Sequence, residues 1–266
     1  MAYLARVWMG SQPNAINQHN WIILVFIHNP NLYNKKDISK MAIIKEERIG
    51  GQRLILGDCL KVMPLLGEFD AVVTDPPYGI GMSGGNVGYK GFNNFTRKDW
   101  DNSPPDVAIE YIKETGLEYI IWGGNYFNLP PARCYLVWDK GAGFRGRTYA
   151  ESELAITNMD ANARTLTHDP LAKGDYRGKV HPTQKPVDVM TWCLGFVKNA
   201  QTILDPFMGS GTTLVACQKL GRMGTGIELD PDYFDIACKR VDAATRQPDL
   251  FVEPPAPQPT QKDFEI

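Results

Sequence analysis

Short apolar segments alternate with helical segments along most of the chain, and this alternation constrains the fold more than any other feature. Near-continuous apolar runs predict strands at Arg53–Leu56, Ala71–Thr74, Tyr119–Trp122, Cys134–Trp138, Glu153–Thr157, Thr202–Leu204 and Gly224–Ile227. Other segments predict helices, at Pro186–Asn199, Thr212–Leu220 and Asp232–Arg246. Apolar strands interleaved with helices are typical of a parallel sheet covered on both faces. We therefore expect an α/β fold with a mostly parallel, twisted sheet and helices on both faces.

The two ends of the chain differ from the part between them. Residues 1–40 show neither helical nor strand periodicity and are rich in Asn and Gln, so we expect a poorly ordered extension. The alternative is that this segment contributes a real edge element to the core. Residues 247–266 carry prolines at 248, 254, 255, 257 and 259 and predict a disordered tail. We expect one domain over residues 41–246.

Composition excludes several classes of protein. The longest apolar run, Trp21–Ile27, has seven residues, far fewer than the roughly 20 of a membrane helix, and no signal cleavage site follows it. The five cysteines form no Cys-x-x-Cys pair, which argues against a disulfide framework or a zinc site. These features predict a soluble, cytoplasmic protein without a metal. The net charge is -2, so any nucleic acid must be bound through local basic loops.

The strand predicted at 71–74 runs directly into Asp75, Pro76, Pro77 and Tyr78, at the edge where open α/β sheets bind ligands. The two prolines fix the backbone and remove two N–H donors. What remains is an acceptor surface, formed by the Asp75 carboxylate and the Pro76 carbonyl, beside the flat ring of Tyr78. This arrangement suits a planar amine such as the exocyclic amino group of a nucleobase. A plain strand-ending turn with an incidental aromatic residue is the alternative.

A second strand, at 202–204, leads into a glycine-rich turn and a helix start, Asp205-Pro-Phe-Met-Gly209-Ser-Gly211-Thr212. The glycines allow close approach of the backbone to a ligand. Leu214 occupies the third position of a dinucleotide-binding Gly-x-Gly-x-x-Gly pattern, and no Gly-Lys-Ser/Thr phosphate loop is present. Glu228 ends the next strand 19 residues after Gly209, a spacing suited to ribose hydroxyls. The pattern indicates a site for an adenosine without a pyrophosphate.

Taken together and in this order, the two segments resemble the amino-group DNA methyltransferases that use S-adenosylmethionine, and specifically their beta class. Two further segments add to the resemblance: His181-Pro-Thr-Gln-Lys185-Pro, and Gly57-Asp58-Cys59 after the first strand. The resemblance covers roughly residues 50–245. It implies the Rossmann-like fold of these enzymes for residues 41–246, S-adenosylmethionine as cofactor, and double-stranded DNA as partner. It also implies methylation of N6 of adenine in a flipped-out base, in a restriction-modification system or as an orphan methylase.

The resemblance assigns roles residue by residue. The catalytic residues are Asp75, Pro76, Pro77 and Tyr78. The cofactor-binding residues are Asp58, Cys59, Asp75, His181, Thr183, Gln184, Lys185, Asp205, Phe207, Gly209, Ser210, Gly211, Thr212 and Glu228. In such an enzyme, Asp75 and the Pro76 carbonyl would accept the amine N–H groups and stabilise the positive charge that develops on nitrogen. Tyr78 would stack on the flipped base.

Recognition of DNA is assigned to short basic loops at about residues 79–105 and 158–180. The candidates are Lys90, Arg97, Lys98, Arg145, Arg147, Lys173, Arg177 and Lys179, each of which could instead be ordinary solvated surface. Beta-class enzymes often carry a large recognition domain between the strand at 153–157 and the His181 segment. This chain has room for only a short connection there. Either the loops alone read the target or a second subunit helps, and a homodimer is the expectation.

Several alternatives stay open. Asp75 favours N6-adenine over N4-cytosine, because the cytosine members of the family more often have Ser at this position. An RNA target and an inactive DNA-binding relative remain as further alternatives. C5-cytosine methylation is disfavoured, since no cysteine follows a proline, and a dehydrogenase is remote without the third glycine. We find no nuclease motif in the sequence.

Overall fold

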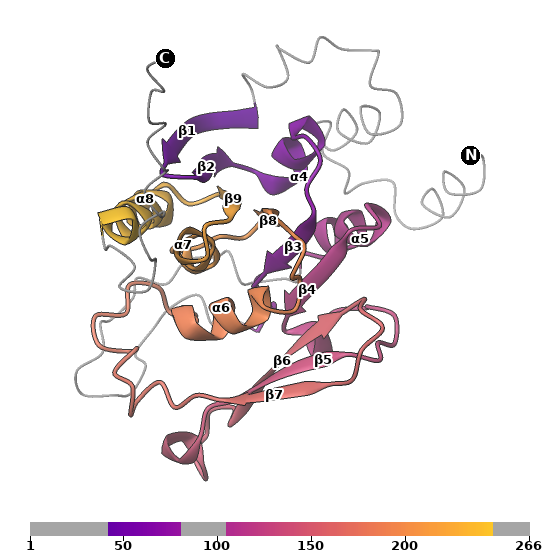
Figure 1. The fold of residues 1–266 in the computed structure, drawn as a ribbon, viewed down its shortest axis with the longest axis vertical. Coiled ribbons are helices and arrows are strands. Elements are labelled where there is room, and N and C mark those ends of the chain that lie inside the picture. Colours follow the sequence, from indigo (N-terminus) through magenta and orange to yellow (C-terminus); the bar gives the residue numbers. More distant parts are fainter. Residues whose placement is uncertain (1–41, 81–104, 247–266) are drawn as a thin grey trace, which may run out of the picture.

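A nine-stranded sheet forms the centre of the molecule (Figure 1). The computed structural model describes residues 42–80 and 105–246, and within them the strand order is β1-β2-β9-β8-β3-β4-β6-β5-β7. Strands β2, β9, β8, β3 and β4 are mutually parallel, whereas β6 runs antiparallel between β4 and β5. The strands are β1 (Ile43–Ile49), β2 (Gln52–Gly57), β3 (Ala71–Thr74), β4 (Glu118–Trp122), β5 (Tyr135–Asp139), β6 (Ser152–Thr157), β7 (Arg164–Thr167), β8 (Thr202–Asp205) and β9 (Met223–Glu228).

Helices cover both faces of this sheet. On one face lie α6 (Val187–Leu194), α7 (Thr212–Lys219) and α8 (Pro231–Arg246); on the other lie α4 (Cys59–Val62) and α5 (Asp106–Glu114). Three short 3₁₀ turns, η1 (Met63–Leu65), η2 (Gly124–Tyr126) and η3 (Ala142–Phe144), complete the described elements. This mostly parallel sheet with helices on both faces confirms the predicted fold class.

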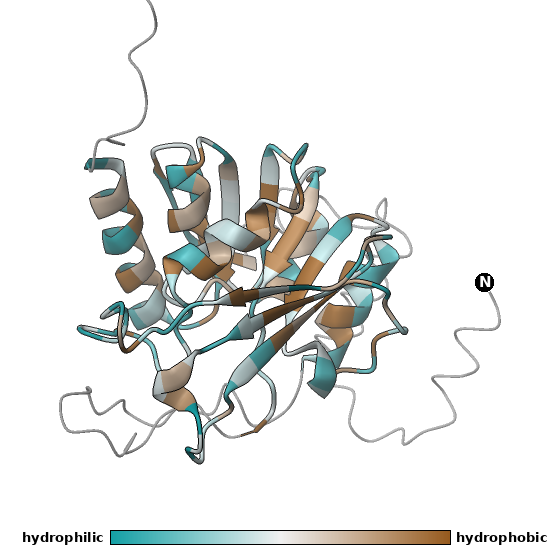
Figure 2. Ribbon diagram, turned by 60° about the horizontal axis from the view of Figure 1, so that its bottom comes forward, coloured by the Kyte–Doolittle hydropathy of each residue, from teal (hydrophilic) through white to brown (hydrophobic). Residues whose placement is uncertain are grey.

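The two faces are separated by the alternation of side chains along the strands. In β3, Ala71 and Val73 point toward α6 and α7, whereas Val72 points toward α5. In β4, Ile120 and Trp122 share the first face and Ile121 the second. All these side chains are buried, and hydrophobic colours run along the central strands in Figure 2. Strands β3 and β4 are apolar on both sides because each side of the sheet packs against helices there.

The chain changes direction between β8 and β3. From β8 it passes through α7 to β9 on one side, and from β3 through α5 to β4 on the other, with the two helices on opposite faces. In open α/β sheets, a crevice forms at the carboxyl ends of the strands at such a point. Here those ends are joined by a buried hydrogen bond, because the Thr74 hydroxyl donates to Asp205 Oδ1 over 2.6 Å.

Each of the strands and helices predicted from the pattern exists, with shifts of a few residues. The helix predicted at 186–199 ends earlier, at Leu194, since the backbone N–H of Gly195 already caps its last turn. Four of the described strands and α-helices were not predicted, namely β1, β7, α4 and α5. The expected extension at 1–40, the loop at 81–104 and the tail at 247–266 lie outside the described residues. Among the residues described, no helix is both long and apolar enough to cross a membrane.

The buried carboxyl group of Asp205 makes stability depend on pH. Burial raises its pKa from 3.8 to about 6, although hydrogen bonds from Thr213 and Thr74 oppose the rise. The folded state therefore holds a proton that the unfolded state has lost between about pH 4 and pH 6, and the free energy of unfolding falls as the pH rises through this window. We expect Asp205→Asn to remove this dependence. Relative to the wild type, the variant should gain roughly 3 kcal/mol of unfolding free energy between pH 4 and pH 7.

Urea denaturation at the two pH values measures this difference. Asp70→Asn is the matched control of opposite sign, because the backbone N–H of Thr202, its hydroxyl and the backbone N–H of Gln201 lower the pKa of Asp70. Its variant should lose stability relative to the wild type as the pH rises. If the difference in unfolding free energy between Asp205→Asn and the wild type did not change with pH, the raised pKa of Asp205 would be contradicted.

Candidate active site

One cavity of about 820 Å³ opens at the carboxyl edge of the sheet. Its volume lies in the upper part of the roughly 300–1,000 Å³ that small-molecule sites occupy. The ends of β2, β8 and β9 line one side with Asp58, Cys59, Phe207, Gly209 and Glu228. The loops after β4 and β5, with the start of β6, line the other side with Tyr126, Trp138, Lys140, Phe144 and Glu153. Because β3 lies in the middle of the sheet, Asp75–Tyr78 separates the two sides.

The four residues after β3 all line this cavity, as their place at the strand end predicts. Asp75 Oδ1 accepts a hydrogen bond from the Tyr78 hydroxyl (2.7 Å) and an ion-pair contact from Lys185 Nζ (2.5 Å). Asp75 Oδ2 has no donor among residues 42–80 and 105–246. Burial raises the pKa of Asp75 above its usual value, and the ammonium of Lys185 opposes that rise. One carboxylate oxygen is thus held by the protein while the other is left for a ligand.

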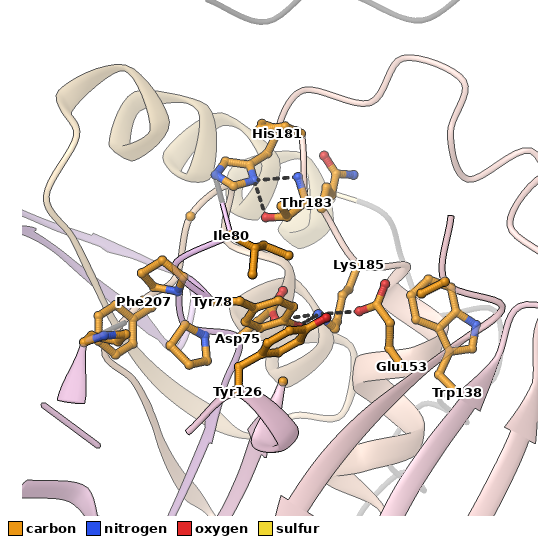
Figure 3. Close-up of a pocket in the computed structure, with 18 of the residues that line it drawn as sticks. Asp75, Tyr78, Ile80, Tyr126, Trp138, Glu153, His181, Thr183, Lys185 and Phe207 are labelled. Atoms are coloured by element: carbon orange, nitrogen blue, oxygen red, sulfur yellow. Dashed lines mark hydrogen bonds and ion pairs between the residues drawn. The ribbon is translucent and has the colours of Figure 1, made fainter. Parts of the chain in front are cut away.

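The ring of Tyr78 is itself stacked on an aromatic partner (Figure 3). Tyr126, from η2, lies parallel to it with ring centroids 5.0 Å apart, and Phe127 meets it edge-on at 6.2 Å. Gly123 makes room for this ring, since a Cβ atom there would lie 2.2 Å from Tyr78 Cε1. Of the two tyrosines, Tyr126 is 45% exposed. The stacked pair therefore forms an aromatic wall next to Asp75, and only part of it was expected from the sequence.

Beyond Asp75, charged side chains of alternating sign extend across the cavity (Figure 3). Lys185 Nζ lies 3.1 Å from Glu153 Oε2, and Lys140 Nζ lies 2.6 Å from Glu153 Oε1. Burial by itself would raise the pKa of Glu153, but Lys185 and Lys140 lower it to about 2. Burial would likewise lower the pKa of Lys185, yet Asp75 and Glu153 raise it. Glu153 and Lys185 are therefore both charged at neutral pH.

On the opposite side of the cavity, Glu228 is held at the end of β9. Its Oε2 accepts from the Gly209 N–H (2.9 Å) and its Oε1 from the Asp230 N–H (2.7 Å), which leaves lone pairs on both oxygens. Burial raises the pKa of Glu228 to about 7, against the effect of these two donors. Asp58 follows the adjacent strand β2 and caps α4 by accepting from the Leu60 N–H (3.1 Å). Ile227, Leu229 and Phe207 supply apolar surface between them.

The segment 181–185 crosses the cavity between these two sides. His181 packs against Tyr233 with ring centroids 4.2 Å apart, and its Nδ1 accepts from the Thr183 N–H (3.3 Å). Burial lowers the pKa of His181 to about 3, so the ring is neutral. Gln184 Oε1 accepts from the Val180 N–H (3.2 Å), a local hydrogen bond that fixes the segment at its start. His181, Thr183, Gln184 and Lys185 all line the cavity.

Four residues of the expected cofactor set lie behind the cavity wall. They are Asp205, Ser210, Gly211 and Thr212, none of which lines the cavity. Asp205 holds the turn from below, since its Oδ1 accepts from the Phe207 N–H (3.1 Å) as well as from Thr74. Arg240 of α8 donates from Nη1 to the Ser210 carbonyl (2.6 Å), to its hydroxyl (2.7 Å) and to Thr212 Oγ1 (3.1 Å). These residues shape the turn that brings Phe207 and Gly209 to the cavity.

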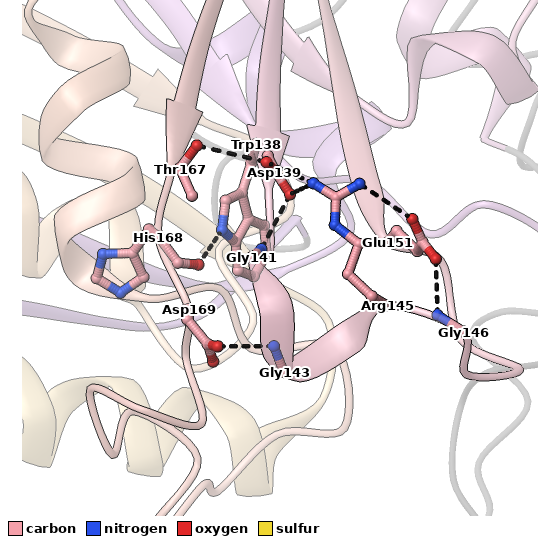
Figure 4. Close-up of polar contacts among 10 residues, drawn as sticks. All are labelled: Trp138, Asp139, Gly141, Gly143, Arg145, Gly146, Glu151, Thr167, His168 and Asp169. Atoms are coloured by element: carbon pink, nitrogen blue, oxygen red, sulfur yellow. Dashed lines mark hydrogen bonds and ion pairs between the residues drawn. The ribbon is translucent and has the colours of Figure 1, made fainter.

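The basic residues expected to contact DNA divide into three groups. Lys90, Arg97 and Lys98 lie outside the described residues. Arg145, Arg147, Lys173 and Arg177 are exposed on the loops after β5 and β7. Arg145 is held in place by Asp139 (3.1 Å) and Glu151 (3.5 Å), as Figure 4 shows. Lys179 instead lies at the cavity, 4.4 Å from the centre of the Tyr176 ring, and burial lowers its pKa to about 8.

The same loop after β5 is fixed by carboxylates that accept backbone N–H groups (Figure 4). Asp169 Oδ2 accepts from the Gly143 N–H (2.9 Å), and Glu151 Oε1 accepts from the Gly146 N–H (2.9 Å). A Cβ atom on Gly143 would lie 2.7 Å from Asp169 Oδ2, so glycine is required for this close approach. The rim of the cavity on this side is consequently an ordered loop.

Sequence reasoning missed Tyr126, Lys140, Trp138 and Glu153. A signal was present for the first, because Gly123-Gly-Asn-Tyr126 follows strand β4 just as Asp75–Tyr78 follows β3. Glu153 lies at the start of β6, and only the antiparallel pairing of that strand brings it to the same edge. Within residues 42–80 and 105–246, no three His, Cys, Asp or Glu side chains are placed to hold a metal ion.

Comparison with known proteins agrees with this geometry. Residues 137–239 match the sequence model of the N6/N4 methylase family, described as DNA methylase, and this range contains the 181–185 segment, the glycine turn and Glu228. The chain is 25% identical to type II methyltransferase M.HpaI of Haemophilus parainfluenzae over 244 residues, 72% of this chain and 74% of that protein.

Two further similarities were found. Type II methyltransferase M2.DpnII of Streptococcus pneumoniae is 33% identical over 171 residues, which is 62% of this chain and 56% of that protein. The match thus spans little more than half the length of this relative. Among solved structures, the M1.HpyAVI–SAM complex aligns with a TM-score of 0.46 at 19% identity, covering 72% of this chain and 99% of that one. The family match and both curated relatives agree that this chain is similar to the N6/N4 DNA methylases.

Proposed function

We propose that the protein transfers a methyl group from S-adenosylmethionine to the exocyclic N6 of adenine in duplex DNA. The observation that carries this proposal is that a single cavity has two chemically different sides, each suited to one of the two reactants. An acceptor-rich, aromatic site around Asp75 lies beside a separate side that presents Glu228, Asp58 and apolar surface. The first suits a planar amine, and the second suits an adenosine. Transfer between two bound reactants requires that they share one enclosed space.

The Asp75 side supplies what methylation of an aromatic amine needs. The lone pair of the amine is delocalised into the ring, so acceptors on its N–H groups favour a nitrogen that can attack. Asp75 Oδ2 is left for this role because Tyr78 and Lys185 engage Oδ1. As the nitrogen takes the methyl group it becomes positive, and the Asp75 carboxylate stabilises that charge and lies ready to take the surplus proton. The Tyr78–Tyr126 pair provides the flat surface for the base.

The other side fits S-adenosylmethionine. Its donor set contains carboxylates for ribose hydroxyls, Asp58 and Glu228, and apolar surface from Phe207, Ile227 and Leu229 for the adenine ring. Both oxygens of Glu228 are already oriented by backbone N–H groups, so its lone pairs point in fixed directions. The bound cofactor supplies an electrophilic methyl group on a sulfonium, which leaves as part of the amine product while sulfur recovers the electron pair. The chain's own residues bind, orient and exclude water.

The target base must leave the duplex to reach this site. The side chain of Asp75 is 20% exposed and lies inside the cavity, where a paired base cannot reach it. Base flipping solves this problem for enzymes that act on base amino groups. The exposed Arg145, Arg147, Lys173 and Arg177 on the cavity rim would contact the DNA backbone. A homodimer remains part of the proposal, because the connection between β6 and His181 is too short for a separate recognition domain.

N4 of cytosine is the second candidate base, because Asp75 and a neighbouring carbonyl would accept from either amine. The adenine assignment rests on Asp75 itself, since Ser is the more frequent residue at this position in the cytosine members of the family. The product decides between the two, and the reaction can be tested without knowing the recognition sequence.

The proposal is tested by incubating the purified full-length protein with S-adenosylmethionine and unmethylated genomic DNA. We expect nucleoside mass spectrometry to detect N6-methyladenine. N4-methylcytosine would keep the chemistry and overturn the choice of base, and no methylated nucleoside from a protein that binds S-adenosylmethionine would overturn the proposed substrate. The Asp75→Ala variant should give no product while its affinity for the cofactor changes less than about threefold. Full activity of that variant would contradict the role of Asp75.

The pKa of Glu228 predicts how cofactor affinity depends on pH. Ribose hydroxyls donate to the carboxylate, so binding requires the deprotonated form, and burial places the pKa at about 7. Affinity should therefore rise by about tenfold between pH 6 and pH 8, as Glu228 loses its proton. In Glu228→Gln the affinity should be weaker at pH 8 and should no longer follow this titration.

Isothermal titration calorimetry at several pH values measures this effect. Glu110→Gln, the same substitution on the exposed face of α5, is the control and should keep the wild-type dependence. If Glu228→Gln retained both the affinity and its pH dependence, Glu228 would not be a contact of the cofactor.

A further inference from the structure

A row of alternating charges lies behind Asp75, and two of its members, Lys140 and Glu153, belong to none of the motifs that carry the resemblance. Lys140 at the end of β5, Glu153 at the start of β6 and Lys185 before α6 come from three separate parts of the chain. They meet in contacts of 2.6 Å (Lys140–Glu153), 3.1 Å (Glu153–Lys185) and 2.5 Å (Lys185–Asp75). The lysine side chains are only 8% and 4% exposed. Burying charged groups costs free energy, and the contacts of these side chains must offset that cost.

The ammonium of Lys185 uses all of its donors within the protein. A lysine has three N–H bonds to donate. Lys185 lies within reach of three acceptors: Asp75 Oδ1 (2.5 Å), Glu153 Oε2 (3.1 Å) and the Tyr78 hydroxyl (2.9 Å). No donor is left for a cofactor, although the position of Lys185 in the 181–186 segment led us to expect a cofactor contact. Its surroundings connect it to the catalytic carboxylate instead.

The same contacts decide which oxygen of Asp75 faces the substrate. Tyr78 and Lys185 both engage Oδ1, so rotation of the carboxylate would break two hydrogen bonds at once. Tyr78 is in turn held by Lys185, which donates to its hydroxyl. The carboxylate and the aromatic ring are therefore positioned by one ammonium group.

Aromatic rings keep both ammonium groups in place from the other side. Lys185 Nζ lies 4.9 Å from the Trp122 ring centre and 5.5 Å from that of Tyr78. Lys140 Nζ lies 5.2 Å from the Trp138 ring centre and 5.3 Å from that of Phe144. Cations over aromatic faces are attracted by the ring quadrupole, most strongly when water is excluded. Glu153, between the two lysines, separates charges that would otherwise repel each other.

We propose that Lys185, anchored by Glu153 and Lys140, is a positioning residue that holds Oδ1 of Asp75 and turns its free oxygen toward the substrate amine. This inference rests on the proposed function for the identity of the amine. It assigns Lys185 to the catalytic carboxylate and not to the cofactor, and it brings Glu153 and Lys140, which no motif identified, into the reaction.

The effect on pH follows from the groups around Asp75. These are Lys185 and Lys179 from the segment before α6, Glu153 from β6, Lys140 from β5, Tyr78 beside it, Asp205 from β8 and the neutral His181. Lys185 is the cation in direct contact with Asp75. Its removal leaves burial and the negative charge of Glu153, both of which raise the pKa of Asp75 further. The acid limb of the activity profile should then move to higher pH.

Lys185→Met tests the proposal, because methionine keeps the length of the side chain and removes the charge. We expect kcat at pH 7 to fall about 100-fold, with partial recovery as the pH rises toward 9, while the dissociation constant for S-adenosylmethionine changes less than about threefold. Lys185→Arg should keep the wild-type pH profile at reduced kcat. Glu153→Gln should lower kcat by about tenfold, because Lys185 loses an anchor, but the acid limb should not move to higher pH because Asp75 keeps its cation. Lys219→Met, on the exposed end of α7, is the matched control.

A second readout does not depend on methylation. Aspartate labelled with ¹³C at the side-chain carboxyl reports titration by NMR, with the Asp75 signal assigned from Asp75→Asn. We expect this carboxyl to titrate at higher pH in Lys185→Met, or in Lys185→Gln should the first variant not fold. An unchanged titration together with a loss of cofactor affinity above tenfold would make Lys185 a cofactor contact and overturn the proposal. If the titration shifts but the wild type methylates no DNA, the positioning role stands and the proposed substrate fails.

Discussion

The contact between the ends of β3 and β8 is the constraint on which the site depends. Thr74 and Asp205 hold these two strands together by a buried hydrogen bond of 2.6 Å, at the point where the chain turns to opposite sides of the sheet. The Asp75–Tyr78 segment begins one residue after Thr74, and the glycine turn begins one residue after Asp205. The sides that we propose for the amine and for the cofactor therefore adjoin because two parallel strands do. Asp205, which does not line the cavity, serves it by fixing this junction.

The central strands could be predicted from sequence because each is buried on both faces. Segments such as Ala71–Thr74 and Tyr119–Trp122 are almost entirely apolar, as is typical of parallel strands that are buried on both faces. The missed elements lie at the edges. Strand β7, with the sequence Arg-Thr-Leu-Thr, is mostly exposed. It pairs with β5 through backbone hydrogen bonds, so its side chains show little of the apolar pattern from which a strand is predicted. Strand β1 carries four charged residues in a row and, among the described strands, pairs only with β2.

The same distinction applies to the site. Residues in the loops directly after parallel strands, such as Asp75 and Phe207, could be placed at one edge from strand order alone. Glu153 reaches that edge because β6 runs antiparallel, and strand direction is a long-range property that its own short apolar pattern does not contain. Lys185 was recognised from its motif, but its partners were not. Its neighbours come from β4, β6 and the end of β3, so its contacts become visible only when the sheet is assembled.

The buried charges around Asp75 are explained by the reaction better than by stability. Removing two ammonium groups and two carboxylates from water is costly, and packed apolar side chains of similar volume often stabilise a fold equally well. In the proposed transfer, positive charge moves from sulfur to the amine nitrogen beside Asp75. Without a counter-ion, burial would raise the pKa of this carboxyl group further, and the neutral form that burial favours stabilises that charge less well. Lys185 supplies the counter-ion before the substrate binds, and Glu153 holds that ammonium on the Oδ1 side, away from the oxygen left for the amine.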